Sequence, residues 1–193
     1  MFSQSKTSRV FREIYRLQNH YTCHATCDAF CCRHDKIHFN HEEYAEILRN
    51  VDEKSSRIIE QKTRLSLEAD FYREFPAGGC PLLKGSKCGI YGNRPDICRM
   101  YPFAFTEYEK IIVAPCDLGI DVLLDYAYWS GDSKFFTYSY HIWQENNNKS
   151  ILLKGLIIGT IHDDKMIKFS EYVENTSYED RKRAREELIK HFE

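Results

Sequence analysis

The sequence lacks the features that mark a membrane or secreted protein. No apolar run in its 193 residues approaches the roughly 18 that cross a bilayer, so we expect no membrane-spanning helix and no membrane partner. The opening stretch, MFSQSKTSRVFREIYRL, has no apolar core followed by a cleavage site, so no signal peptide is visible. We therefore expect a cytoplasmic protein, and in that compartment thiols stay reduced.

The sequence also has little net charge and no phosphate-binding loop. Its formal net charge is −2, so no global attraction to nucleic acid follows, and we expect no specific nucleic-acid binding. A G-x-G-x-x-G loop is absent, which leaves a Rossmann-type site for a nucleotide or S-adenosylmethionine without support. Acidic residues flank the basic run Arg181-Lys182-Arg183-x-Arg185, which favours a solvated helix that pairs its own charges.

Cysteine, by contrast, is abundant. Four of the eight cysteines fall within ten residues. Cys31 and Cys32 are poor disulfide partners, because neighbouring Cα atoms are about 3.8 Å apart and a relaxed disulfide needs about 4.4–6.8 Å. Clustered cysteines in a reducing compartment more often hold zinc or iron–sulfur. We therefore predict that all eight are metal ligands: Cys23, Cys27, Cys31, Cys32, Cys80, Cys88, Cys98 and Cys116.

The spacing of the first cysteines restricts the kind of site. Cys23, Cys27 and Cys31 are four residues apart, so on a straight helix they would form a stripe roughly 12 Å long. Two thiolates on one zinc lie at most about 4.6 Å apart. Either this segment bends, or its cysteines serve a multinuclear cluster or two separate sites. His24 lies inside the run and is the histidine to watch as a further ligand.

The second group of cysteines lies in a segment rich in turn residues. Residues 80–91 predict a tight hairpin with a cysteine at each end, in which backbone N–H groups point at thiolate sulfur. Pro95 suits the first turn of a short helix that Pro102 ends. Arg94 and Arg99 flank Cys98, and they would bind the cofactor by neutralising a buried thiolate cluster; pairing with nearby carboxylates is the alternative.

The remaining pattern predicts an α+β fold of short strands and hairpins around the metal site, with flanking helices. Asn40 and Glu43 form a capping box for a helix from His41 to about Asp52. Residues 156–169 fit a hairpin, although a helix through 150–161 competes, and Thr176 caps a last helix to about His191. We expect a cysteine-cluster domain over residues 1–125 and an aromatic-rich helical extension over 126–193, packed on it. The other predicted elements are helices at 7–19, 54–69, 121–129 and 134–144, strands at 37–39 and 71–75, and a hairpin over 104–114.

The cysteine motifs, taken with their neighbours, are specific. They are Cys23-x3-Cys27-x3-Cys31-Cys32, Cys80-Pro-Leu-Leu, Cys88-Gly-Ile-Tyr, Arg94-Pro95, Cys98-Arg99-x-Tyr101-Pro102-Phe103 and Cys116. Over roughly residues 20–120 this set resembles the YkgJ-type cysteine-cluster family, described as a zinc- or iron-chelating domain. The first run, with Asp28, is also similar to flagellin lysine N-methylases, which carry this kind of domain with an iron–sulfur cluster. The resemblance implies a metal or cluster site and, less directly, a methyltransferase.

Three functions follow from these observations. The first is an iron–sulfur protein, with a 4Fe-4S cluster as the expected form, that does redox or protein-modifying work and has a protein substrate as its partner. The second is a zinc module for protein interaction, in which two four-cysteine sites use all eight ligands. The third is a cysteine-nucleophile enzyme, but nothing singles out one thiol with a paired base. Soft thiolate ligands favour iron–sulfur over zinc.

Overall fold

The computed structural model describes residues 12–24, 27, 29–34, 36–67, 72–76, 79–105, 110–114, 116–132, 156–160 and 164–191. The regular elements of these residues are helices and short antiparallel strands, which confirms the predicted α+β class. The chain packs as two compact units, named here for their place in the sequence. The central unit comprises residues 25–101, and the terminal unit comprises residues 1–24 and 102–193. The predicted division into 1–125 and 126–193 stays a prediction.

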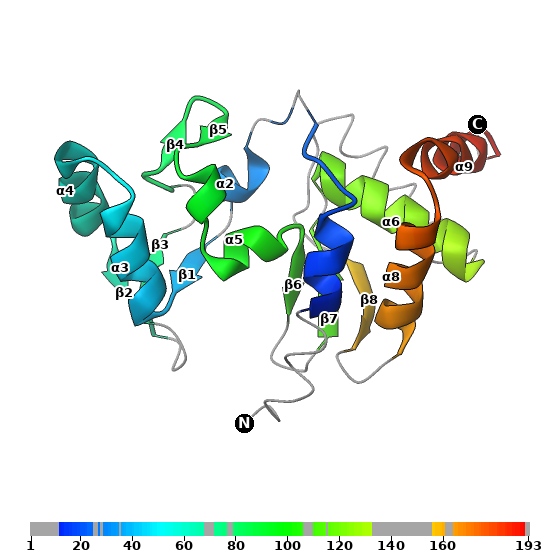
Figure 1. Cartoon of the computed structure of the whole chain (residues 1–193), viewed down its shortest axis with the longest axis horizontal. Coiled ribbons are helices and arrows are strands. Elements are labelled where there is room, and N and C mark those ends of the chain that lie inside the picture. Colours follow the sequence, from blue (N-terminus) through cyan, green and yellow to red (C-terminus); the bar gives the residue numbers. More distant parts are fainter. Residues whose placement is uncertain are drawn as a thin grey trace. The chain divides into compact units, whose positions relative to one another are not determined.

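A three-stranded antiparallel sheet forms one part of the central unit, in the order β1-β3-β2 (Figure 1). Strand β1 (Ile37–Phe39) pairs with β3 (Arg73–Phe75), which also pairs with β2 (Arg64–Leu65). Strands β1 and β3 confirm the strands predicted from the alternating sequence at 37–39 and 71–75. The fully buried rings of Phe39 and Phe75 meet edge to face, with centroids 4.5 Å apart.

Two helices of the central unit follow β1, and each begins at a side-chain cap. In α3 (His41–Arg49), Asn40 and Glu43 form the predicted capping box, with each side chain accepting from the other residue's backbone N–H. Helix α4 (Glu53–Lys62) starts at Asp52, whose carboxylate accepts from the Ser55 N–H. These caps satisfy N–H groups that would otherwise lack partners within the helix.

The cysteine-bearing elements of the central unit are short. They are the helix α2 (Phe30–His34), the hairpin of β4 (Leu83–Lys84) and β5 (Lys87–Cys88), the 3-10 turn η1 (Tyr91–Asn93) and the helix α5 (Asp96–Met100). The hairpin over residues 80–91 and the short helix after Pro95 are both as predicted. Cys80, Cys88 and Cys98 pack against the apolar core that includes Phe39 and Phe75, so the core of the unit supports the segments that carry these thiols.

A second antiparallel sheet belongs to the terminal unit and has the order β6-β7-β8. Strands β6 (Phe103–Phe105) and β7 (Lys110–Val113) form the hairpin predicted over 104–114. Strand β8 (Leu156–Thr160) pairs with β7 and excludes the competing helix through 150–161. The prediction of a second hairpin strand at 166–169 is wrong, because these residues belong to the helix α8 (Lys165–Asn175). Met166, Phe169 and Val173 recur at helical spacing and are buried.

Three further helical segments complete the described part of the terminal unit. Residues 12–18 are helical and bury Ile14 and Leu17, as predicted for the amphipathic opening segment. Helix α6 (Asp117–Ser130) is longer than the predicted helix at 121–129 and lies against α9 (Tyr178–Lys190). Ser177, rather than Thr176, caps α9 through the Asp180 N–H. The helix predicted at 134–144 lies outside the described residues.

The basic face of α9 differs from the sequence-based prediction. Arg183 is exposed and pairs with Asp180, as expected for a self-paired helix. Arg181 and Arg185, however, are only 1% and 5% exposed, so the prediction of a solvated face is wrong for them. Their acidic partners lie on α6, far away in sequence. No helix in the described residues is long and apolar enough to cross a membrane.

Candidate metal centre

The helix α2, which carries Cys31 and Cys32, starts from an unusual backbone conformation. Ala29 has φ +66°, a left-handed value that residues with a side chain rarely adopt. Its carbonyl oxygen accepts from the N–H groups of Cys32 and Arg33 at 2.9 and 3.1 Å. The chain therefore turns sharply into α2 and does not continue a straight helix from Cys27. This removes the 12 Å stripe that regular helical spacing would give.

The hairpin carrying Cys80 and Cys88 directs backbone N–H groups at both sulfur atoms. The Leu82 N–H donates to Cys80, and the Ile90 N–H donates to Cys88; each bond lowers the pKa of its thiol. The turn is tight, since the Gly89 N–H donates to the Leu82 carbonyl oxygen at 2.8 Å. A Cβ on Gly89 would lie 3.0 Å from that same oxygen. The predicted cysteine knuckle is thus present, and its amide donors favour negative charge on sulfur, although burial outweighs this effect at Cys88 and raises that pKa.

The thiols of α2 connect to this hairpin through hydrogen bonds. Cys31 donates to Cys32 across 4.0 Å, and Cys32 donates to Cys80. The bond from Cys31 lowers the pKa of Cys32, but the bond donated to Cys80, burial and the charges of Cys80 and Cys88 outweigh it and raise this pKa to about 12. The bond from Cys32 is the main reason why the pKa of Cys80 is lowered. Of Cys32 and Cys80, Cys80 is therefore the thiol that ionises more readily.

Cys98, on α5, brings a fifth thiol into the same group. Burial is the main cause that raises its pKa well above the ordinary value, and the charges of Cys31, Cys32 and Cys88 add to it. Burial likewise raises the pKa of Cys88. Thiols that change one another's pKa in this way lie near one another. The central unit thus gathers Cys31, Cys32, Cys80, Cys88 and Cys98.

The two arginines predicted to bind the cofactor differ in their surroundings. The charge of Arg94 lowers the pKa of both Cys88 and Cys98. Its guanidinium lies over the Tyr91 ring, 3.8 Å from the centroid, and its Nε donates to the Tyr91 carbonyl oxygen. Arg99 donates through Nε to the Arg94 carbonyl oxygen at 2.8 Å. Arg94 therefore supplies positive charge beside the thiols, and Arg99 supports its backbone.

The other three predicted ligands have separate positions. Cys27 belongs to the central unit and is half-buried. Cys23 and Cys116 belong to the terminal unit, where Cys116 caps α6 by accepting from the Gly119 N–H at 3.3 Å. Their place in a metal site with the five thiols stays a prediction. None of the eight cysteines, all of which the structure describes, forms a disulfide.

The donor chemistry of the central unit fits a soft metal. Thiols are the ligands that zinc and iron–sulfur clusters take, and nearby amide and guanidinium groups offset the charge of their ionised form. Within the described residues, however, no three His, Cys, Asp or Glu side chains form a set already placed to hold one metal ion. The thiols lie near one another, and Cys31, Cys32 and Cys80 are joined by hydrogen bonds. Metal–sulfur bonds would replace these hydrogen bonds when a metal binds.

The comparison with protein families agrees with this chemistry. Residues 22–117 match the model of the CxxCxxCC family, described as a "putative zinc- or iron-chelating domain". This stretch of the chain is therefore similar to that family. It includes all eight cysteines and both arginines discussed above. The match supports metal binding by this stretch. The searches of curated proteins and of solved structures returned no match.

Sequence reasoning missed the aspartates that contact residues at the start of the cysteine run. Asp121 lies 2.9 Å from His24 through Oδ2, and Asp125 accepts from the Tyr21 hydroxyl at 2.8 Å. A signal was present, because Asp125 interrupts an otherwise apolar stretch of α6 (Val122 to Ala127). A charged residue in such a stretch predicts a buried ion pair. The charged partners of Asp125 lie on α9, so no local sequence pattern identifies them.

Proposed function

We propose that the central unit holds an iron–sulfur cluster through the thiolates of Cys31, Cys32, Cys80, Cys88 and Cys98. The observation that carries this proposal is the convergence of five interacting thiols from three short elements. A 4Fe-4S cluster takes four thiolates, each on its own iron, so this unit can supply a full set by itself. The ligands would be drawn from these five, with Cys23, Cys27 and Cys116 completing the predicted set of eight.

The arrangement favours a cluster over a single zinc ion. Thiolates on one zinc must all lie within about 4.6 Å of one another, whereas thiolates on a cluster are spread over several irons. No three candidate ligands in the described residues meet the single-ion requirement. The amide donors at Cys80 and Cys88 are also the groups that adjust the reduction potential of a cluster.

Charge compensation supports the same proposal. A thiolate cluster carries negative charge, which is costly to bury unless cations lie nearby. Arg94 already lowers the pKa of two thiols, so its charge acts at the site. Arg99 holds the backbone of Arg94 and would bind the cofactor only indirectly.

The work of the cluster would be redox chemistry or the modification of a protein substrate in the cytoplasm. If every iron is bound by thiolate, electron transfer follows; an iron with an open position would bind a substrate or cofactor directly. A methyltransferase-like activity, suggested by the likeness of the first cysteine run to flagellin lysine N-methylases, belongs to the second case. The alternative is a zinc module without catalysis, in which two four-cysteine sites use the eight cysteines.

The deciding experiment is anaerobic purification of the full chain, followed by an absorption spectrum and analysis of iron, sulfide and zinc. A brown protein with broad absorption near 400 nm, roughly the region of thiolate-to-iron charge transfer, and with matching acid-labile sulfide supports the cluster. A colourless protein with about one or two zinc ions per chain supports the zinc module instead. Addition of S-adenosylmethionine to the brown protein then tests whether the cluster spectrum responds.

Variants test the ligand set. Cys31→Ser and Cys98→Ser should each lower the metal content and destabilise the fold, because metal binding contributes to folding. Ser86→Ala, at the exposed turn of the β4–β5 hairpin, is the matched control and should keep the metal content of the wild type. Full metal content and unchanged stability in both cysteine variants would exclude the site as proposed.

A further inference from the structure

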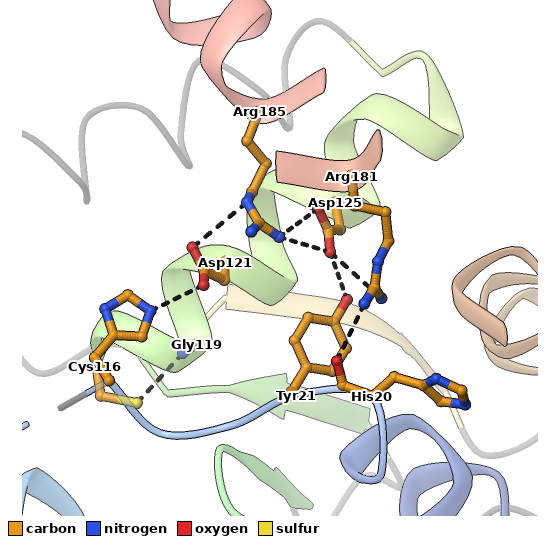
Figure 2. A network of polar contacts seen from close by, with 9 residues as sticks. His20, Tyr21, Cys116, Gly119, Asp121, Asp125, Arg181 and Arg185 are labelled. Carbon is orange, nitrogen blue, oxygen red and sulfur yellow. Dashed lines mark hydrogen bonds and ion pairs between the residues drawn. The ribbon is translucent and has the colours of Figure 1, made fainter. Parts of the chain in front are cut away.

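Residues 20–24, at the start of the cysteine run, are held at three points by helices α6 and α9 of the terminal unit (Figure 2). One point is a backbone carbonyl, one a tyrosine hydroxyl and one an imidazole ring. The contacts are Arg181 Nη2 to the His20 carbonyl oxygen at 3.1 Å, the Tyr21 hydroxyl to Asp125 Oδ2 at 2.8 Å, and His24 Nε2 to Asp121 Oδ2 at 2.9 Å. The last contact falls on the residue next to Cys23.

Arg185 of α9 joins the two aspartates of α6 into one network. Its Nη1 donates to Asp125 Oδ1 and Oδ2 at 2.9 and 3.0 Å. Its Nε lies 3.5 Å from Asp121 Oδ1, on the carboxylate whose other oxygen faces His24. A guanidinium is suited to this role, because its planar fork presents donors in fixed directions to more than one carboxylate. Asp121 is thus held from one side by Arg185 and from the other by His24.

The ion pairs of Asp125 with Arg181 and Arg185 are buried, so they carry a cost in free energy, whereas the His24–Asp121 contact is exposed. Asp125 and Arg181 are each 1% exposed, and Arg185 is 5% exposed. Nε and Nη1 of Arg181 have no hydrogen-bond partner in the described part of the chain, although Nη1 lies 3.8 Å from Asp125 Oδ2. Apolar residues of similar volume often stabilise a helix interface as well as or better than buried ion pairs. What the ion pairs add is a fixed geometry.

That geometry reaches two predicted metal ligands. Cys23 is next to His24 in the chain, and Cys116 caps the helix α6 that carries Asp121. The network therefore ties the backbone carrying Cys23 to the helix that Cys116 begins. The helix that completes it, α9, lies outside the matched residues 22–117.

We propose that Asp121 and Arg185 are positioning residues for two predicted metal ligands, because they hold the segments carrying Cys23 and Cys116 in register. Helix α9, which carries Arg185, then contributes to metal retention. The inference rests on the proposed metal-binding function and adds to it a requirement for residues outside the matched stretch 22–117. Groups that orient metal ligands without binding the metal typically change its affinity 10- to 100-fold when they are removed.

The test uses the full chain and the variant Asp121→Asn, which keeps the side-chain shape but loses the charge facing Arg185 and His24. The matched control is Asp164→Asn, because Asp164 is exposed and makes no capping hydrogen bond at the start of α8. Two quantities are measured: the chelator concentration that removes half of the bound metal, and the thermal midpoint of the metal-free protein. We expect Asp121→Asn to lose its metal at roughly tenfold less chelator than the control, beyond any change in the metal-free midpoint.

Arg185→Lys is the second variant, with the exposed Arg183→Lys as its control. Lysine keeps the charge but not the fork that reaches both aspartates, so it should also release metal earlier. Equal metal retention in Asp121→Asn, Asp164→Asn and the wild type would overturn the inference while leaving the proposed function intact. A wild-type protein that binds neither iron nor zinc would instead overturn the proposed function, and this inference with it.

Discussion

The sulfur of Cys116 accepts a hydrogen bond from the backbone N–H of Gly119 at 3.3 Å, and this bond caps the start of α6. Gly119 lies so close to the preceding strand that a Cβ atom there would be 1.7 Å from the Ala114 carbonyl oxygen. The absence of a side chain at Gly119 therefore allows both the approach of α6 to the end of β7 and the placement of Cys116. A predicted metal ligand thus depends on a glycine that itself has no donor side chain.

We accordingly expect Gly119→Ala to destabilise the protein by about 2 kcal/mol or more, because backbone rather than a flexible side chain must move. Denaturant unfolding of the metal-free protein measures this change. Gly92→Ala is the control, since a Cβ on Gly92 meets no atom within 4 Å. A cost for Gly119→Ala no larger than that for Gly92→Ala would contradict the close approach.

The left-handed backbone of Ala29 gives a second prediction. A residue with a side chain costs about 1–2 kcal/mol at such a φ, and glycine removes that cost. Ala29→Gly should nevertheless be close to neutral, because glycine makes the unfolded chain more flexible and the buried methyl group is lost. Ala29→Val should destabilise the metal-free protein by about 2 kcal/mol, since a β-branched residue adopts this φ poorly. Thermal unfolding of both variants provides the comparison, and equal stability of the two would argue against a left-handed Ala29.

Arg94 and the thiols it faces predict a dependence on pH. Burial raises the pKa of Cys88 and Cys98 above the ordinary value of 9.0, while the charge of Arg94 lowers both. A thiol with a raised pKa in the folded protein contributes stability that is present below its unfolded pKa and lost as the pH rises through its folded pKa. The metal-free protein should therefore lose stability as the pH rises above about 9.

Removal of the cation should strengthen this burial effect. Arg94→Gln should raise the pKa of Cys88 further, so that less thiolate is present at a given pH and alkylation of metal-free protein by iodoacetamide becomes slower. The rate of alkylation at Cys88 is measured by mass spectrometry across the pH range. Arg99→Gln keeps the charge of Arg94 and serves as the control. Identical pH profiles for the two variants would show that Arg94 does not act on the thiols.

Local sequence signals were enough to predict most elements of the central unit. The alternation at 37–39, the capping box at Asn40 and the glycines and proline of the hairpin each act over a few residues, so each can be read from the sequence. The same holds for the amide donors at Cys80 and Cys88, which follow from the hairpin turns. The approach of α2 to this hairpin is different, because it depends on contacts between residues about 50 apart in the chain.

The errors lie where tertiary contacts overrule local patterns. Residues 166–169 alternate enough to suggest a strand, but they are helical, and Phe169 meets Tyr126 edge to face and Trp129 at a tilt. Arg181 and Arg185 look solvated beside their acidic neighbours in sequence. They are buried because they form ion pairs with Asp121 and Asp125 of α6. No local sequence pattern in α9 predicts these ion pairs.

Glu43 links the best-predicted element of the chain to one of the thiols. Its Oε2 accepts from the Asn40 N–H at 2.9 Å within the capping box, and its Oε1 accepts from the Asp96 N–H at 2.8 Å, at the start of α5. Cys98 lies two residues further along α5. The same carboxylate therefore supports two helix starts. At the start of α5 it accepts from the Asp96 N–H, because the N-cap residue Pro95 has no side chain that could accept a hydrogen bond.

Glu43→Ala should destabilise the metal-free protein by about 1–2 kcal/mol, because both acceptors are lost. Asn40→Ala should cost about 1 kcal/mol, since it removes the cap of α3 but leaves the bond to Asp96. Only Glu43→Ala should also speed the alkylation of Cys98, because only this variant loosens the first turn of α5. Glu42→Ala, exposed in the same turn of α3, is the control for both measurements. Equal alkylation of Cys98 in the Glu43 and Asn40 variants would show that the carboxylate does not hold α5.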